Sequence, residues 1–171
     1  KEFMPQTGQK ENTIQFNYVM GDELVNVKYR DGRKNFKLYK GAEKIFYNIN
    51  SIVGYDWCVI TEGEMDALAL HEAGIKNVIS VPNGATLNSN NLDYLDNCID
   101  YFEDKEKIIL AVDADEAGQA LRYEFIRRLG AEVCYLVDFN GNKDPNDFLI
   151  ENGAEELRKV ITTATQVPLE G

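Results

Sequence analysis

The sequence is poor in the side chains that soft-metal and nucleophilic chemistry need. It has one histidine and three cysteines in 171 residues, and no two cysteines form a Cys-x-x-Cys pair. This scarcity argues against a zinc site and against a Ser-His-Asp hydrolase. The pattern instead predicts buried free thiols in a reducing, cytoplasmic setting. The residues concerned are His71, Cys58, Cys98 and Cys134.

Long apolar segments are also absent. No run approaches the roughly 20 residues that span a bilayer, so we expect no membrane partner. No Gly-x-x-x-x-Gly-Lys-Ser/Thr sequence occurs, which argues against a P-loop in these residues. Residues 1–8 contain neither an initiator methionine nor the apolar core of a signal peptide, and we expect the chain to be a fragment of a longer protein.

Basic residues are scarce overall but are concentrated near the N-terminus. The net charge is −11, yet residues 1–50 hold nine Lys/Arg against six Asp/Glu, while the remainder holds nine against 23. A basic N-terminal part followed by an acidic remainder suits a protein that binds a polyanion on one part and cations on another. On charge alone, the asymmetry can equally be accidental.

The N-terminal part is predicted to be a small antiparallel sheet, and we assign residues 1–54 to this basic, β-rich subdomain. Asp31-Gly32 between two alternating runs is a strong hairpin signal. Lys28 and Arg30 fall on one face of their strand, and Lys34 follows the turn. This face can take phosphates, or it can be a solvated edge that discourages aggregation. The alternating segments are 14–20, 24–30, 35–39 and 46–49.

From about residue 55 the pattern changes to strands that alternate with helices. Buried strands are predicted at 57–61, 77–81, 108–112 and 132–138, and helices between and after them at 64–73, 92–102, 116–129, 148–152 and 155–163. Such alternation implies right-handed crossovers and a parallel sheet. We therefore predict an α/β fold over residues 55–165, with a parallel Rossmann-like sheet flanked by helices, and a linker or tail at 166–171.

Acidic residues follow three of the predicted strands. They are Glu62, Asp113, Asp115 and Asp144. The carboxyl ends of parallel strands meet at one edge of a sheet, so these acids can converge. For the third strand a simpler alternative exists, in which Asp115 caps the next helix and Asp113 is a turn residue.

Converging carboxylates raise one another's pKa, and a bound divalent cation relieves that conflict. An all-oxygen ligand set favours Mg²⁺ or Mn²⁺ over zinc. Magnesium is typically held by a couple of carboxylates together with substrate phosphates. The acids therefore predict metal-assisted phosphoryl or nucleotidyl transfer.

The segments around these acids resemble the three motifs of the Toprim domain, which DnaG-type bacterial primases, topoisomerases and some nucleases share. The segments are Thr61-Glu-Gly-Glu-Met-Asp-Ala-Leu68, Asp113-Ala-Asp-Glu-Ala-Gly118 and Lys143-Asp-Pro-Asn-Asp147. Residues 24–31 and Lys34-Asn35-Phe36 are similar to the primase part of phage primase-helicases and of their mitochondrial relative Twinkle. The resemblance covers roughly residues 14–163.

This resemblance implies a primase domain that makes short RNA primers on single-stranded DNA from ribonucleoside triphosphates. By the same resemblance, Glu62 is a general base or metal ligand and Asp66 is a helix acid that supports the site. The implied ligands of Mg²⁺ or Mn²⁺ are Glu62, Asp113, Asp115 and Asp144. The implied contacts to template or triphosphate are Lys28, Arg30, Lys34 and Lys143.

Asn146 is a departure from the family, because the DnaG-type third motif usually has Asp there. A zinc-ribbon module and a ring helicase, which accompany this domain in the family, are expected elsewhere in the parent chain. Two alternatives stay open: a catalytically silent Toprim module that binds nucleic acid, and a Toprim nuclease.

Overall fold

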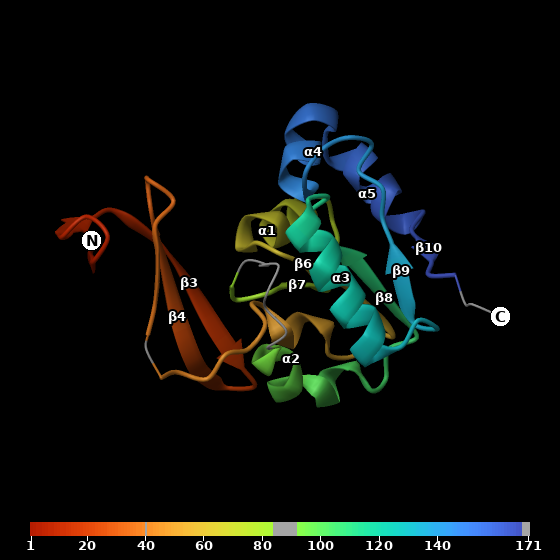
Figure 1. Ribbon diagram of the computed structural model, residues 1–171, viewed down its shortest axis with the longest axis horizontal. Coiled ribbons are helices and arrows are strands. Elements are labelled where there is room, and N and C mark those ends of the chain that lie inside the picture. The colour runs from red at the N-terminus through yellow and green to blue at the C-terminus, as the bar shows by residue number, and fades with distance from the viewer. Residues whose placement is uncertain (40, 84–91, 169–171) are drawn as a thin grey trace.

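The computed structural model describes residues 1–39, 41–83 and 92–168 (Figure 1). The strands are β1 (Glu2–Met4), β2 (Gln9–Glu11), β3 (Thr13–Met20), β4 (Glu23–Asp31), β5 (Phe36–Leu38), β6 (Trp57–Thr61), β7 (Val78–Ser80), β8 (Lys107–Ala111), β9 (Cys134–Leu136) and β10 (Thr165–Gln166). The helices are α1 (Glu64–Glu72), α2 (Asp93–Asn97), α3 (Glu116–Leu129), α4 (Pro145–Asn152) and α5 (Ala154–Thr162), with short 3-10 helices η1 (Ile49–Ile52) and η2 (Ile99–Phe102).

A five-stranded sheet forms the centre of the larger part, in the order β10-β9-β8-β6-β7. Strand β6 runs parallel to β7 and β8, and β8 runs parallel to β9. The central strands are almost continuously apolar because helices cover both faces of the sheet. The predicted architecture, a mostly parallel sheet flanked by helices and preceded by a small antiparallel sheet, is confirmed.

Each face of the central sheet has its own core. Ile60 of β6 packs on one face in a cluster that includes Phe125 of α3, the helix that crosses in front of the sheet in Figure 1. Val59, the neighbouring residue, packs on the other face with Leu70 of α1 and Leu157 of α5. Adjacent strand residues thus serve opposite cores, which is why the strands need apolar side chains at successive positions.

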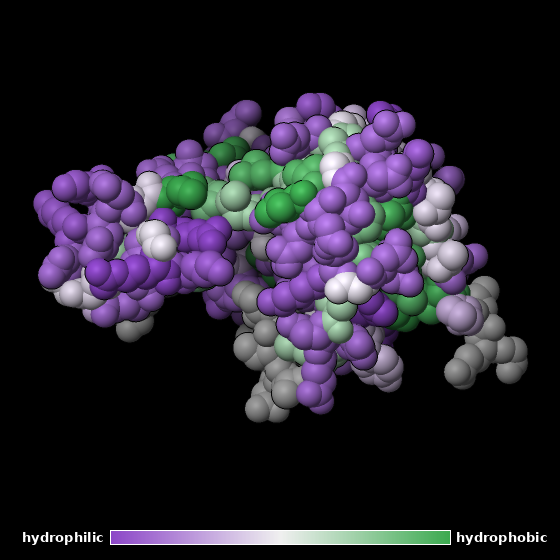
Figure 2. Space-filling view, turned by 90° about the horizontal axis from the view of Figure 1, so that it is seen from above, coloured by the Kyte–Doolittle hydropathy of each residue, from purple (hydrophilic) through white to green (hydrophobic). Residues whose placement is uncertain are grey.

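The antiparallel sheet β3-β4-β5 lies beside this α/β part, and the β1-β2 hairpin lies at its outer end (Figure 1). Phe16 and Tyr18 of β3 are buried in the same core cluster as Ile49 and Ile79 of the larger part. Seen from above, a band of hydrophobic residues lies between the hydrophilic outer ends of the molecule (Figure 2). The two parts therefore share apolar packing.

The turn after β4 is built around the carboxylate of Asp31. Its Oδ1 accepts hydrogen bonds from the backbone nitrogens of Arg33 and Asn35, at 2.9 and 2.8 Å. Lys34 between them has a φ of 64°, in the left-handed region that short turns use. The hairpin predicted at Asp31-Gly32 is thus confirmed.

The strand predicted at residues 46–49 is wrong. Phe46 and Ile49 are fully buried in the core of the larger part, and Tyr47 makes an isolated bridge to Ser80. The alternating apolar residues anchor this connection to the central sheet, where it continues into η1, and they do not extend the small sheet.

Other predicted elements differ from the structure in extent. The helix predicted at 92–102 divides into α2 and η2, and the fourth strand shortens to Cys134–Leu136. The tail predicted from Gln166 begins inside the sheet, because Thr165 and Gln166 pair antiparallel with Leu136 and Tyr135. This pairing protects the edge of β9, which would otherwise be open.

The three cysteines are free and buried, as predicted; the reducing compartment stays a prediction. Within the described ranges, no helix combines the length and the apolar character that crossing a membrane requires.

Candidate active site

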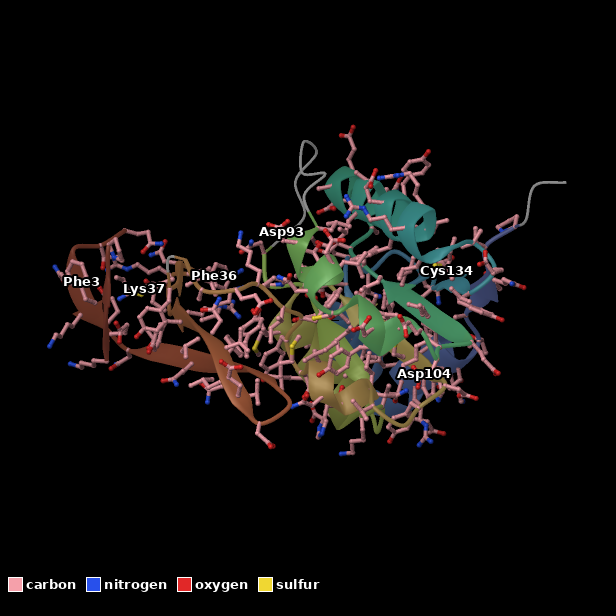
Figure 3. All side chains as sticks on the ribbon, turned by 90° about the horizontal axis from the view of Figure 1, so that it is seen from below. Phe3, Phe36, Lys37, Asp93, Asp104 and Cys134 are labelled. Atoms are coloured by element: carbon pink, nitrogen blue, oxygen red, sulfur yellow. The ribbon has the colours of Figure 1, made fainter. Side chains whose placement is uncertain are left out.

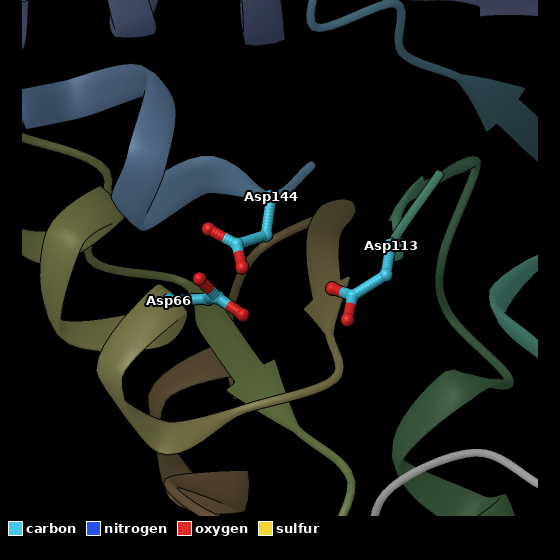
Figure 4. A group of neighbouring side chains, drawn as sticks. All are labelled: Asp66, Asp113 and Asp144. Atoms are coloured by element: carbon cyan, nitrogen blue, oxygen red, sulfur yellow. The ribbon is translucent and has the colours of Figure 1, made fainter. Parts of the chain in front are cut away.

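Three aspartates gather at the carboxyl edge of the central sheet. They are Asp66 in the first turn of α1, Asp113 just after β8 and Asp144 at the N-cap of α4. One carboxylate oxygen from each lies within 4.8 Å of the others, and Figure 4 shows the three side chains pointing toward one another. The parallel pairing of β6 with β8 brings α1 and the Asp113 loop to the same edge.

The electrostatics of this group favour the binding of a cation. Burial and then the neighbouring Asp144 raise the pKa of Asp66 to about 8. The same two causes raise the pKa of Asp113 to about 6. Oδ1 of Asp113 is buried and has no hydrogen-bond partner among the described residues. A cluster of three carboxylates, one of which has a buried oxygen without a partner, fits a hard divalent cation such as Mg²⁺ or Mn²⁺.

Glu62 supports the Asp113 loop from the end of β6. Its Oε1 accepts a hydrogen bond from the backbone nitrogen of Asp113 at 3.0 Å. Burial and the nearby Asp113 carboxylate raise the pKa of Glu62 to about 7. Gly118 makes this approach feasible, because a Cβ there would collide with the carbonyl oxygen of Asp113 and with Oε1 of Glu62. The glycine of the second motif is therefore a packing requirement of the site.

The group differs from the four metal ligands predicted from the sequence. Asp113 and Asp144 lie close together, and Asp66, for which the resemblance implies a supporting role, lies with them. Asp115 is exposed and caps α3, with its Oδ1 accepting from the backbone nitrogen of Gly118 at 2.8 Å. The capping alternative thus describes this residue, and Glu62 and Asp115 lie outside the group of three.

Asn146, the departure from the family pattern, takes part through its backbone. Its nitrogen donates to Oδ1 of Asp66 at 3.1 Å, while Oδ1 of Asp144 accepts from the backbone nitrogen of Asp147 at 2.9 Å. The start of α4 therefore fixes the orientation of two of the three carboxylates.

The aspartates line a cleft of about 760 Å³ whose other wall is basic. Residues that line it from the antiparallel sheet are Lys28, Arg30, Lys34, Phe36 and Leu38, and residues from the α/β part include Glu62, Asp66, Asp113, Lys143 and Asp144. Hence all four cations predicted to contact template or triphosphate line the same cleft as the carboxylates. Nζ of Lys143 lies 4.0 Å from Oδ2 of Asp113.

Lys28 differs from the other cations because it is buried and paired. Its Nζ lies 2.8 Å from Oε1 of Glu64 and donates to the carbonyl oxygen of Pro82 at 2.9 Å. The hydroxyl of Tyr18 donates to the same Glu64 oxygen at 2.5 Å. Tyr18 and Lys28 come from the antiparallel sheet and Glu64 from α1, so this cluster joins the two walls of the cleft. In the described ranges no carboxylate pairs with Arg30 or Lys34.

Glu64 and Tyr18 were not identified from the sequence. Glu64 is the first residue of the helix predicted at 64–73, and its side chain is only 5% exposed. The available signal was an acid two residues after Glu62, at the end of a predicted strand. Periodicity alone does not say which lysine faces it.

Comparison with known proteins agrees with this geometry. A family model described as Toprim-like matches residues 59–149. A primase homolog protein of Arabidopsis thaliana is 37% identical over 94% of the chain, and a Twinkle homolog protein of the same plant is 34% identical over 94%. The crystal structure of the primase fragment of the bacteriophage T7 primase-helicase has a TM-score of 0.75 and 26% identity over 86% of the chain.

The sheet order, the strand-end acids and the family match define a Toprim domain. The chain belongs to the Toprim family, as a primase-type domain of the kind found in phage primase-helicases and Twinkle homologues. It spans 52% of the primase homolog, 25% of the Twinkle homolog and 61% of the T7 fragment.

Proposed function

We propose that this chain is the polymerase domain of a DNA primase, which joins ribonucleoside triphosphates into short RNA primers on a single-stranded DNA template. The observation that carries the proposal is the pairing of a three-carboxylate group with a basic wall across one cleft. A nucleotidyl transferase needs both, because the metal-bound phosphates and the template backbone are polyanions.

In this proposal Asp66, Asp113 and Asp144 hold Mg²⁺ or Mn²⁺. The cation supplies neutralisation of triphosphate charge and a lower pKa for an attacking 3′-hydroxyl. Glu62 lies beside Asp113, and burial raises its pKa above the usual range of a carboxyl group; we propose it as the group that accepts a proton. The hydrogen bond that Glu62 accepts from the Asp113 backbone also keeps the Asp113 carboxylate in place.

The cations of the cleft hold the polyanions, with Arg30 and Lys34 on the wall of the antiparallel sheet and Lys143 on the α/β wall. Arg30, Lys34 and Lys143 are proposed to contact template or triphosphate directly. Lys28 was predicted to do the same, and two of its three ammonium hydrogens have protein acceptors in Glu64 and Pro82. Its main contribution is therefore to position the strand that carries Arg30.

The test is dinucleotide synthesis from labelled ATP and CTP with Mn²⁺ and single-stranded DNA. We expect product from the wild-type chain and none from Asp113→Asn. The matched control is Asp56→Asn, which makes the same chemical change at an exposed residue just before β6, at the opposite edge of the sheet. Synthesis that survives Asp113→Asn, or metal uptake that does, contradicts the proposed site.

The same assay separates the alternatives. One of them, a catalytically silent Toprim module that binds nucleic acid, gives DNA binding and no product. A Toprim nuclease gives shortened DNA. A zinc-ribbon module and a ring helicase are proposed partners in the parent chain, so we expect this domain alone to prime with little sequence specificity. Robust sequence-specific priming by the isolated chain contradicts that expectation.

A further inference from the structure

We propose that Phe36 is a stacking platform for the base of a nucleotide whose phosphates lie among the carboxylates of the cleft. This inference rests on the proposed function, because it requires a nucleotide at that site. It adds the group that recognises the base, which the acids and cations do not supply.

The first argument is the register of the antiparallel sheet. Arg30 pairs with Phe36, and Lys28 pairs with Leu38. Paired residues share a face of an antiparallel sheet and alternate with their neighbours, so these four side chains point to one side. All four line the cleft.

The opposite face of the same strands is chemically different. Tyr29 pairs with Lys37, and Nζ of Lys37 binds Oε1 of Glu2 at 2.7 Å and the carbonyl oxygen of Phe3 at 3.0 Å. Figure 3 shows the consequence for two adjacent residues: Phe36 lies nearer the α/β part, and Lys37 lies toward the N-terminal hairpin with Phe3. Phe36 is therefore directed into the cleft by the strand itself.

The second argument is that Phe36 is a partly exposed aromatic ring inside a charged cleft. It is 44% exposed, so part of its surface stays accessible in the cleft. Nζ of Lys28 lies 4.5 Å from the ring centroid and Cζ of Arg30 lies 5.9 Å from it. Cations at these distances hold the ring by cation–π attraction.

The third argument is the complementarity of the whole cleft to a nucleotide. A triphosphate needs the metal and cations, and a base needs a flat apolar surface, preferably aromatic, next to them. The cleft offers the carboxylates on one wall and Arg30 and Phe36 on the other, in a volume of about 760 Å³, which lies within the usual range for a small-molecule site.

The experiment compares two ligands, ATP and inorganic tripolyphosphate, which share the phosphates and differ in the nucleoside. Binding of each is measured by calorimetry with Mn²⁺ for the wild type, Phe36→Leu and Phe36→Trp. The control is Phe3→Leu, the same substitution at a phenylalanine that is 47% exposed and lies at the outer hairpin. Urea midpoints of all variants are recorded to show that the fold is retained.

We expect Phe36→Leu to weaken ATP binding by about fivefold to a hundredfold, the range for loss of one base–aromatic stack. Tripolyphosphate binding should change less than twofold, and Phe36→Trp should retain ATP binding. Phe3→Leu should change neither affinity.

Three results would contradict the proposal that Phe36 is a stacking platform. One is unchanged ATP affinity in Phe36→Leu, and another is an equal loss of both ligands, which indicates distortion of the cleft. The third is a wild-type chain that binds ATP no more tightly than tripolyphosphate, in which case the proposed function stands without the platform. If the wild type binds neither ligand with Mn²⁺, the proposed function fails and the platform fails with it.

Discussion

The ion pair between Lys28 and Glu64 gives the sharpest prediction about stability. The side chains are 8% and 5% exposed, their charged atoms are 2.8 Å apart, and the pair bridges the antiparallel sheet and α1. Glu64→Gln keeps the shape and removes the charge. It leaves the Lys28 ammonium buried beside a neutral amide, the Pro82 carbonyl and the Phe36 ring.

Removing one partner of a buried pair typically costs about 3–5 kcal/mol. We expect about 3 kcal/mol for Glu64→Gln, the low end of that range, because the glutamine carbonyl can still accept from Tyr18. For a chain of this size, that loss lowers the melting temperature by about 6–12 °C. A change of this kind is a large part of the free energy of unfolding of an ordinary domain.

The assay is equilibrium unfolding in urea, with Glu156→Gln as the control. Glu156 pairs with Lys159 on the surface of α5 at 3.3 Å, with both side chains more than half exposed, and such pairs are worth below about 1 kcal/mol. Adding Lys28→Met to Glu64→Gln should recover part of the loss, because the unpaired charge disappears. If Glu64→Gln costs no more than Glu156→Gln, the cluster does not join the two parts as described.

Three further predictions concern the acids and their supports. Without metal, the free energy of unfolding should fall as the pH rises from about 4 to about 8. Folding raises the pKa of Asp113 to about 6 and of Asp66 to about 8, so in this range the folded state binds more protons than the unfolded state, and raising the pH destabilises it. Thermal melts across pH should show this fall, smaller in Asp66→Asn and with Mn²⁺ added; a rise would contradict it. Gly118→Ala should unfold at clearly lower urea than Gly32→Ala, since only the first Cβ meets the site, and equal midpoints would remove the packing requirement. Asp115→Ala should lose about 1 kcal/mol as a lost N-cap and keep its Mn²⁺ affinity; loss of metal binding would restore Asp115 as a ligand.

The sequence predicts the strand ends well because burial and chain direction fix them. Asp113 follows a continuous apolar run, and a buried strand of that kind must end at the sheet edge. Asp144 was predicted in the loop after the fourth strand, at the same edge of the sheet. Its role as the N-cap of α4, with a proline at the first helical position, was missed because the helix was predicted to begin at residue 148. These local rules suffice to place both residues at the site.

The place of Asp66 is not local. The side chain of a helix residue can point in several directions. The direction of the Asp66 carboxylate is fixed by a hydrogen bond from the backbone nitrogen of Asn146, which is 80 positions away in the sequence. The partner of Lys28 is not local either, because Glu64 belongs to another element and periodicity assigns a lysine to a face without saying what packs on that face. Strand β10 escaped prediction because two residues cannot show an alternation.

The Asp31 turn has a consequence for how this protein tolerates insertions. Oδ1 of Asp31 accepts hydrogen bonds from the backbone nitrogens of Arg33 and Asn35, and these bonds fix the length of the loop and the residue at which β5 begins. One residue gained or lost there would shift the strand by a single step, which exchanges its two sides. Lys37 would then face the carboxylates and Phe36 the outer hairpin. Homologues that vary in this hairpin should therefore change its length by even numbers of residues.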